Sequence, residues 1–299
     1  MSSRPKLLSQ ALAALSASAM AVCVSCATPE ADTGTTWVVS DQDLGPKKAS
    51  GRRDMDLSDP ATSYLAAEQF VPMLDWEQPG IMIPKELWGA LLRPTVSDSG
   101  ICPIEEVSGG GTVYRTYGCR SSQGYAWSGE VSEDRWEASG WSWERYDFDI
   151  EVLGDTDDVA FDRIALHGAV VFVDGREDSV LKEAVLVNVS ATAEGWLSRA
   201  DLNDPRETLW QDWRATGRYE LSQDGNHRLD LDADLASLGS VTLQSQNLQV
   251  GCHLVPDGTL RLRSTSDATM QFRGATDCRR CAGYTVDGAE LGDACGVGD

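Results

Sequence analysis

Hydrophobic and polar side chains alternate with a period of two along much of the chain after about residue 101. In residues 146–152, aromatic and aliphatic side chains alternate with acids, and the same alternation returns at residues 229–234 and 260–263. A strand that packs on a core with one face and meets water with the other has this pattern. The sequence therefore predicts a mainly β fold built from antiparallel strands.

Two stretches, residues 164–173 and residues 184–189, are apolar at nearly every position. Strands that are covered on both faces have this pattern, so both stretches are expected near the centre of a sheet. Asp-Gly dipeptides, which favour short hairpin turns, separate several of the expected strands. They begin at Asp174, Asp224, Asp257 and Asp287. Tight turns between consecutive strands predict an antiparallel meander or an open sandwich.

Short helices are expected beside the strands. Pro60 follows Asp59, a good N-cap, and Pro84 begins a second apolar stretch, so two short N-terminal helices are expected. An inserted helix is expected over residues 204–213, which open with Asp-Pro-Arg-Glu and place Trp213 on an apolar helical face.

The length and composition favour a single folded domain. The chain has 299 residues, of which 41% are hydrophobic, enough for a substantial core. We expect one disulfide-stapled β-rich domain over residues 58–299, with a helical lead-in at residues 58–95 and a cysteine-rich tail at residues 277–299.

The first 25 residues have the features of a signal peptide. Arg4 and Lys6 give a basic beginning, and residues 7–24 carry no charge. This apolar stretch is diluted by serines and ends in small residues, which fits a cleaved signal better than a membrane-spanning helix. Residues 26–57 are rich in Asp, Gly, Ser, Thr and Pro, and this composition predicts a flexible tether.

The sequence Cys-Val-Ser-Cys that ends at Cys26 resembles the lipobox of bacterial lipoproteins, with Cys23 where those proteins usually have Leu. The resemblance implies cleavage before Cys26, lipidation of its sulfur and attachment to a membrane through the lipid. Ala27 follows, where family members kept in the inner membrane have Asp, so the resemblance implies the outer membrane, on its periplasmic or its surface side. Ordinary signal cleavage after Ala21 or after Ala27 is the alternative.

The chain is strongly acidic, with 47 Asp and Glu, 25 Lys and Arg, and a formal net charge of -22. Removal of residues 1–25 takes away two basic residues and no acid, so the charge of the remainder changes from -22 to -24. Such a charge repels nucleic acids and anionic lipid head groups, which argues against a nucleic-acid partner.

Six cysteines lie outside the signal and the lipobox, and an even number predicts three disulfides in an oxidising compartment. They are Cys102, Cys119, Cys252, Cys278, Cys281 and Cys295. Cys102 and Cys119 enclose a glycine-rich turn, which favours a bridge that closes a hairpin. The other four allow three pairings, of which we favour Cys252–Cys278 with Cys281–Cys295.

Cys278 and Cys281 leave two alternatives open, a zinc site with Cys252, His253 and Cys295, or a redox pair. Zinc sites usually have a second paired motif, which the sequence lacks, and the pair precedes a glycine-rich tail rather than opening a helix. The acids of residues 155–162 lack the spacing of a calcium loop. We therefore expect no metal and no cofactor.

Trp141 and Trp143 form the candidate ligand-binding site. Side chains at every second position of a strand lie on the same face, so both tryptophans share a face with Asp147 and Asp149. Both indoles are therefore expected to point toward water. Flat aromatic rings beside acids on a β surface are suited to stacking on sugar rings, and Trp127 and Trp136 would extend such a platform. The alternative is that Gly140 or a bulge shifts the register by one residue and buries both indoles in the core.

No catalytic residue is identified by the sequence. The chain has no nucleophile elbow, phosphate-binding loop or dinucleotide motif, and its acids alternate along strands as they do on a solvated face. The expected function is a non-enzymatic binding or structural role in the cell envelope, with another envelope protein or a glycan as partner. A carbohydrate-binding module is the first alternative, and a hydrolase with paired carboxylates is the second.

Overall fold

The computed structural model describes Leu44, residues 53–70, Trp88 and residues 102–295, apart from 121–124, 139, 155–162, 176–178, 195–211, 236–237, 251–255, 275 and 277–280. Cys26, Cys252, Cys278 and the acidic loop at residues 155–162 lie outside the described residues. So does the expected second helix, except for Trp88.

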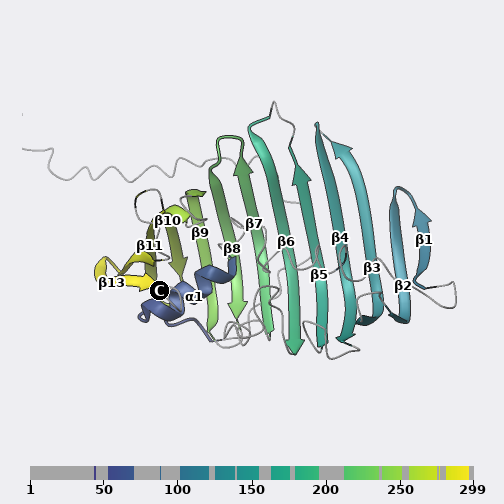
Figure 1. Ribbon diagram of the computed structural model, residues 1–299, viewed down its shortest axis with the longest axis horizontal. Helices are drawn as coiled ribbons and strands as arrows, with labels where there is room; N and C mark the ends of the chain where they lie inside the picture. The colour runs from purple at the N-terminus through teal and green to yellow at the C-terminus, as the bar shows by residue number, and fades with distance from the viewer. Residues whose placement is uncertain are drawn as a thin grey trace, which may run out of the picture. The chain divides into compact units, whose positions relative to one another are not determined.

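The described strands form one antiparallel sheet of thirteen strands, and their order in the sheet is their order in the chain. Figure 1 shows them side by side from β1 to β13. This is the predicted mainly β meander, with every strand hydrogen-bonded to its neighbours in sequence. The strands are β1 (Ile104–Ser108), β2 (Gly111–Arg120), β3 (Tyr125–Ala138), β4 (Trp141–Gly154), β5 (Arg163–Asp174), β6 (Leu181–Glu194), β7 (Asp212–Ser222), β8 (His227–Leu235), β9 (Gly239–Val250), β10 (Pro256–Arg263), β11 (Asp267–Arg273), β12 (Cys281–Val286) and β13 (Ala289–Cys295).

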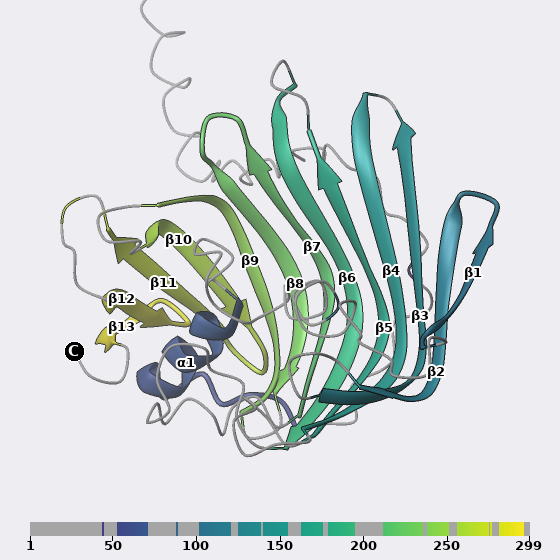
Figure 2. The same cartoon turned by 45° about the vertical axis from the view of Figure 1, so that its right-hand side comes forward.

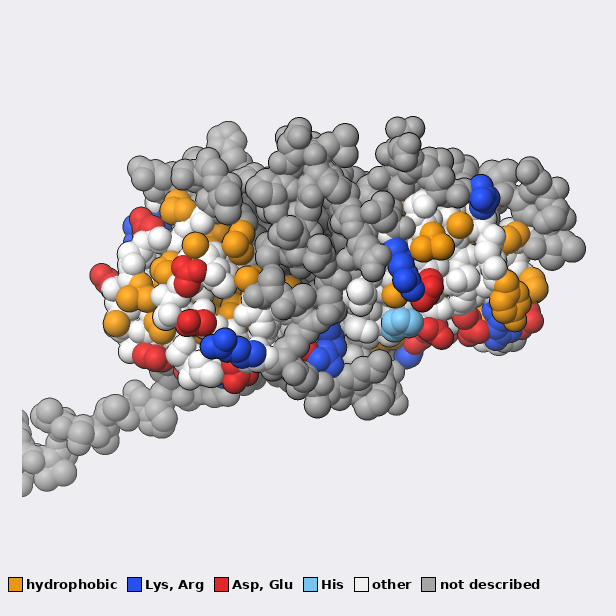
Figure 3. Space-filling view, turned by 90° about the horizontal axis from the view of Figure 1, so that it is seen from below, with side chains coloured by type: hydrophobic (Ala, Val, Ile, Leu, Met, Phe, Trp, Pro, Cys, Tyr) orange, Lys and Arg blue, Asp and Glu red, His pale blue; other side chains and the backbone are white. Residues whose placement is uncertain are grey.

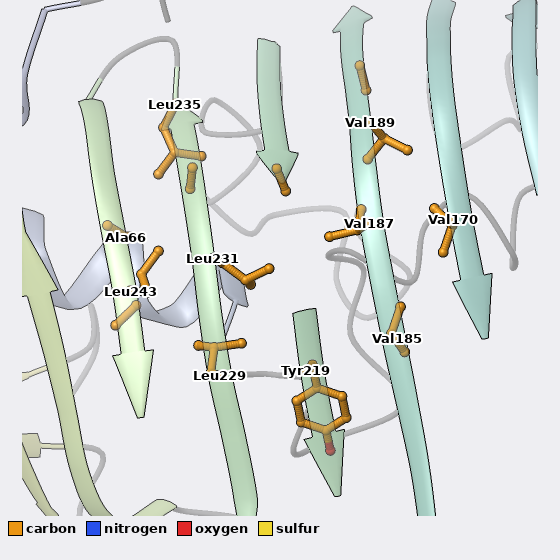
Figure 4. Close-up of a cluster of buried hydrophobic side chains, with 14 of the residues drawn as sticks. Ala66, Val170, Val185, Val187, Val189, Tyr219, Leu229, Leu231, Leu235 and Leu243 are labelled. Carbon is orange, nitrogen blue, oxygen red and sulfur yellow. The ribbon is translucent and has the colours of Figure 1, made fainter. Parts of the chain in front are cut away.

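Alternation along the strands produces one core face and one polar face. In β4, Phe148, Ile150 and Val152 are buried on the core face, whereas Asp149 and Glu151 are exposed on the polar face. The core side chains of neighbouring strands lie opposite one another in register, so they join into one hydrophobic cluster. Figure 4 shows part of this cluster, in which valines, leucines and Tyr219 of adjacent strands meet Ala66 of the helix.

The N-terminal part packs on the core face. Helix α1 (Pro60–Phe70) begins after Asp59, whose carboxylate accepts a hydrogen bond from the backbone N–H of Ala61 at 3.2 Å. Tyr284 of β12 donates its hydroxyl hydrogen to the carbonyl oxygen of Leu57 at 2.7 Å. Figure 2 shows α1 on the inner side of the bent sheet, near β13, which it contacts.

Met55 and Leu57 are fully buried, although they belong to the stretch 26–57 whose composition indicates a tether. The bridge between Asp54 and Ser240 places the chain beside β9 just before these two residues enter the core. The residues immediately before α1 are thus part of the folded domain and not of a tether.

Strands β5 and β6 are buried on both faces near the centre of the sheet, as their continuous apolar runs predict. Besides the side chains on the core face, five apolar side chains of the polar face are at most 2% exposed. They are Ala169, Val171, Val173, Ala184 and Leu186.

Two of the predicted disulfides are present, Cys102–Cys119 and Cys281–Cys295. The first joins the end of the β2 strand to the residues that lead into β1, and the second joins the paired ends of β12 and β13. Because Cys281 is bonded to Cys295, the redox alternative loses the thiol of Cys281, and the zinc alternative loses the thiols of both Cys281 and Cys295.

Two local predictions are wrong. Asp257-Gly258 does not form a hairpin turn but lies inside β10, beside a bulge in its pairing with β9, and Gly258 has a φ of 120°. Trp213 belongs to β7 and not to an inserted helix; residues 204–211 lie outside the described part. In contrast, Asp287-Gly288 makes the expected turn between β12 and β13, with φ values of 49° and 81°.

Candidate binding surface

Trp141 and Trp143 lie on the polar face at the end of the β3–β4 hairpin. Trp143 is directly opposite Trp136 of β3 and Val173 of β5, and Trp141 is opposite Ala138. The register is regular from Trp141 to Asp149, so both tryptophans share a face with Asp147 and Asp149, as parity predicts. No bulge shifts this part of β4, and the indoles do not enter the hydrophobic core.

The three residues Trp136, Trp141 and Trp143 form a tryptophan cluster. Trp136 and Trp143 are stacked, with ring centroids 5.6 Å apart and planes 12° apart. Trp141 is tilted against Trp143 with centroids 6.2 Å apart. The Trp143 indole N–H donates a hydrogen bond to the carbonyl oxygen of Ala138 at 3.4 Å.

The three indoles of the tryptophan cluster differ in how much of their surface is exposed. Trp143 is only 5% exposed, so the expectation that it points toward water is wrong. Its burial is achieved on the polar face, beside Trp136 and Val173, and not by a shifted register. Trp136 and Trp141 are half-buried and offer the accessible indole surface. Trp127, the other residue considered for the platform, is buried on the core face against Trp88.

The acids next to the tryptophan cluster are held by basic partners. Arg145 binds Asp147 with two hydrogen bonds, Nε to Oδ2 at 2.7 Å and Nη2 to Oδ1 at 2.8 Å. Asp149 Oδ1 lies 2.8 Å from Nδ1 of His167 on β5. Beyond the tryptophans, β4 therefore presents a strip of paired polar groups, with Asp149 almost fully exposed. Hydroxyl-rich ligands meet both donors and acceptors on such a strip.

Cross-strand ion pairs occur widely on the polar face. Arg115 of β2 bridges Glu106 of β1 and Glu130 of β3, at 2.5 Å to each. Arg163 of β5 contacts Glu151 of β4 at 2.9 Å. Figure 3 shows acidic and basic side chains close together on the side seen from below. These pairs are exposed, so each adds little to stability, but they fix the positions of the side chains.

A second charged cluster, on the core face, was not identified from the sequence. Glu133 is buried and accepts a hydrogen bond from the indole N–H of Trp88 at 3.4 Å. Arg135 contacts Glu133 at 2.5 Å and Glu144 at 3.1 Å, and the Tyr146 hydroxyl donates to Glu144 at 3.2 Å. Burial raises the pKa of Tyr146 to about 12. The sequence contains one signal for this cluster. Glu133 and Arg135 follow Val131 at alternate positions of β3, so they belong to the face that packs on the core.

The Glu133 cluster is suited to holding side chains in place. Glu133 and Glu144 share one guanidinium, and each also accepts a hydrogen bond from an aromatic side chain. Such a network satisfies buried carboxylates and fixes Trp88 against Tyr114 and Trp127, with ring centroids at 4.9 and 5.6 Å. The cluster lies on the opposite face of β3 and β4 from the tryptophan cluster, so one small ligand cannot contact both.

His227 and Tyr219 form a buried pair at the end of the core face. His227 Nδ1 lies 2.7 Å from the Tyr219 hydroxyl. Burial, with a smaller contribution from the positive charge of Lys182, lowers the pKa of His227 to about 4. Burial, followed by the negative charge of Glu183, raises the pKa of Tyr219. The tyrosine therefore stays protonated beside a neutral imidazole, and the two groups share one hydrogen bond.

The described residues contain neither a metal-ligand cluster nor a helix suited to spanning a membrane. Among the residues that the structure describes, no three His, Cys, Asp or Glu side chains are grouped as metal ligands would be. No helix within the described ranges has the length and apolar character needed to cross a membrane.

Comparison with known proteins gives no match. No protein-family model, no curated protein and no solved structure is similar to this chain.

Proposed function

We propose that this chain is an exported, lipid-anchored protein of the cell envelope with a non-enzymatic binding or structural role, and that its polar face is the binding surface. The observation that carries the proposal is the half-buried Trp141, which packs against the Trp136–Trp143 stack on a face that also carries many charged side chains. Partly exposed tryptophans on a rigid element are typical anchors of protein interfaces.

The surroundings of the tryptophan cluster support binding at this position. The cluster is built on two long paired strands, so its indoles are held by the register of β3 and β4. Sites on such elements are positioned more accurately than sites on loops. The neighbouring acids Asp147 and Asp149 are held by Arg145 and His167, an arrangement that favours recognition of a ligand.

A pull-down from crosslinked envelopes tests the proposed binding surface. The wild-type protein is expected to recover an envelope component that Trp141→Ala fails to recover. Leu153→Ala is the matched control, because Leu153 is an exposed hydrophobic side chain on the same face of the same strand. Equal recovery by the wild type and by Trp141→Ala would place binding elsewhere and overturn the proposed surface.

A carbohydrate ligand is the second candidate function, favoured by the flat indole of Trp141 beside the polar strip of β4. The apolar face of a pyranose stacks on an indole while its hydroxyl groups bond to nearby carboxylates and guanidinium groups. Titration with envelope glycans is expected to shift the tryptophan emission of the wild type and of Leu153→Ala but not of Trp141→Ala. The absence of a shift with every glycan would remove this candidate without affecting a protein partner.

The intact mass of the mature protein from isolated membranes tests the anchor. A chain that begins at Cys26 and carries acyl chains is expected, with its other cysteines protected from alkylation. An unmodified chain that begins at Val22 or Thr28 would replace the lipid anchor with a soluble exported protein.

A further inference from the structure

The two edge strands of the sheet, β1 and β13, differ in how their outer edges are protected. Within the described part of the chain, β1 pairs with β2 alone and β13 with β12 alone. Figure 1 shows them at opposite ends of the sheet. An edge strand exposes backbone N–H and C=O groups that can pair with another chain, so natural sheets usually cover, kink or charge their edges.

Strand β13 carries several of these protections. Its pairing with β12 contains a bulge between Tyr284 and Thr285, and Gly292 has a φ of 95°, so the strand is irregular. The Cys281–Cys295 disulfide fixes its end, and α1 contacts it. Such an edge is a poor template for a further strand.

Strand β1 is regular and open by comparison. Its five residues contain no glycine, proline, lysine or arginine, and its pairing with β2 is uninterrupted from Ile104 to Ser108. The four residues from Ile104 to Val107 are all exposed, and Val107 is 74% exposed. The strand is therefore accessible along its outer edge and on both of its faces.

The turn at Gly109-Gly110 determines which backbone groups of β1 face outward. Both glycines have a positive φ, 62° and 105°, as a two-residue hairpin turn requires. Ser108 and Gly111 close this hairpin, so their backbone groups point toward each other. Because this direction alternates along a strand, Glu105 and Val107 direct their N–H and C=O groups away from β2.

Exposed apolar side chains gather beside this edge. Six large hydrophobic side chains are exposed among the described residues, and three of them belong to β1 and β2. They are Ile104, Val107 and Tyr117, which are 44%, 74% and 97% exposed. Ile104 and Tyr117 lie on the polar face and Val107 on the other, so an added strand would find apolar contacts on both faces.

The charges near this edge favour a basic partner. Strand β1 has Glu105 and Glu106 and no cation, and strands β1 to β3 together contain six acids and three arginines, a net charge of -3. Arg115 contacts Glu106 on the polar face, whereas Glu105 is on the other face, opposite Tyr114. A second copy of this chain, with its net charge of -22, would bring the same acids against each other.

We propose that β1 is a docking strand for an extended, basic segment of a partner protein, which adds to the sheet beside β1. Backbone hydrogen bonds with Glu105 and Val107 set the register of the added segment. Its apolar side chains pack on Ile104, Val107 and Tyr117, and its lysines or arginines face Glu105 and Glu106. The site uses none of the residues of the tryptophan cluster, so the proposal goes beyond the proposed function and does not depend on it.

Titration of a fluorescent peptide with the full chain tests the docking strand. The probe is a synthetic peptide of alternating lysine and valine, about as long as β1, and its fluorescence anisotropy reports binding. Val107→Pro removes one outward N–H and should raise the Kd at least about tenfold. Val107→Ala is the matched control, because it keeps that N–H and should bind nearly as well as the wild type. Glu105→Gln should weaken binding by removing one of the acids.

Amide hydrogen exchange, measured by nuclear magnetic resonance, supplies a test that needs no variant. Saturating peptide should slow exchange at Glu105 and Val107 by at least about tenfold. The amide of Glu106 should change little, because it faces β2. A fully N-methylated peptide of the same sequence keeps the charge and cannot donate backbone hydrogen bonds, so it should not bind.

Three results would overturn the proposal. Failure of the wild type to bind the lysine–valine peptide would exclude a basic partner strand at β1. Equal binding of the N-methylated peptide would mean that charge alone attracts the probe. Self-association of the wild type in concentrated salt, abolished by Val107→Pro, would assign the edge to a second copy of this chain.

Discussion

The buried His227 makes the stability of the sheet depend on pH. Its folded-state pKa is about 4, against an ordinary value of 6.5, because the imidazole is buried. A base with a lowered pKa is charged more easily in the unfolded chain, so acid favours unfolding. The contribution of His227 is therefore fully present above pH 6.5 and is lost as the pH falls through 6.5 toward 4.

The size of the effect follows from the two pKa values. Between pH 7 and pH 5 the unfolded chain gains about 0.7 proton at His227 and the folded chain gains about 0.1. The free energy of unfolding should fall by about 2 kcal/mol over this interval, and by about 3 kcal/mol once both states are protonated. Few carboxylates with ordinary pKa values titrate above pH 5, so His227 is expected to dominate this interval.

Urea unfolding at pH 7 and pH 5, followed by far-ultraviolet circular dichroism, measures this difference. His227→Gln removes the titrating group, keeps a polar side chain near the Tyr219 hydroxyl and should make the free energy of unfolding nearly the same at both pH values. His167→Gln is the matched control, because His167 is half exposed on the polar face and its replacement should preserve the wild-type loss. A wild-type loss that persists in His227→Gln would refute the reasoning.

Three further changes test other parts of the structure by the same unfolding measurement. Replacement of Cys281 and Cys295 by Ser opens a loop of 14 residues and should lower the free energy of unfolding by about 3 kcal/mol; an unchanged value would mean that the bridge does not constrain the unfolded chain. Trp143→Ala should cost about 3–5 kcal/mol because it leaves a cavity, whereas Trp141→Ala should cost about 1 kcal/mol, and equal costs would contradict the difference in their burial. Gly239→Ala should cost about 1–3 kcal/mol, because its φ is 107° and the added Cβ meets the backbone of the segment before α1; no loss would show that this segment can move away freely.

The sequence predicts the fold class because the alternation of side chains is local information. Phe148, Ile150 and Val152 indicate the core face of β4 without any knowledge of the neighbouring strands. The hairpin glycines and the two hairpin disulfides are local in the same sense, since each joins strands that are adjacent in sequence. A meander is built from such neighbours, and this explains why the prediction of a meander succeeds.

The tryptophan cluster shows where the prediction from sequence stops. Parity alone places Trp143 on the polar face, which is confirmed. Its burial depends on which residue of β3 lies opposite, and only the register of the hairpin identifies Trp136 as the stacking partner. The prediction of a hairpin turn at Asp257-Gly258 fails for a related reason. The pairing of β10 with β9 contains a bulge that accommodates this dipeptide inside the strand.

The Glu133 cluster was missed because charged residues at the end of an apolar strand face are normally solvent-exposed. In the folded chain, Glu133 is covered by Trp88, a residue 45 positions away that parity cannot place. Burial that comes from such distant segments cannot be predicted from one strand alone.

The contact between α1 and the last two strands has a consequence for the order of folding. Each strand pairs with the next along the chain, so the sheet can grow by closing one short loop after another. The hydrogen bond from Tyr284 to Leu57 instead closes a loop of 227 residues, which costs about 2.4 kcal/mol more chain entropy than a 14-residue hairpin. Helix α1 should therefore dock last, after β12 has formed, although it is made before every strand. During synthesis, the N-terminal segment is complete before the C-terminal strands exist, and a chain that stops before β12 leaves α1 without its partner.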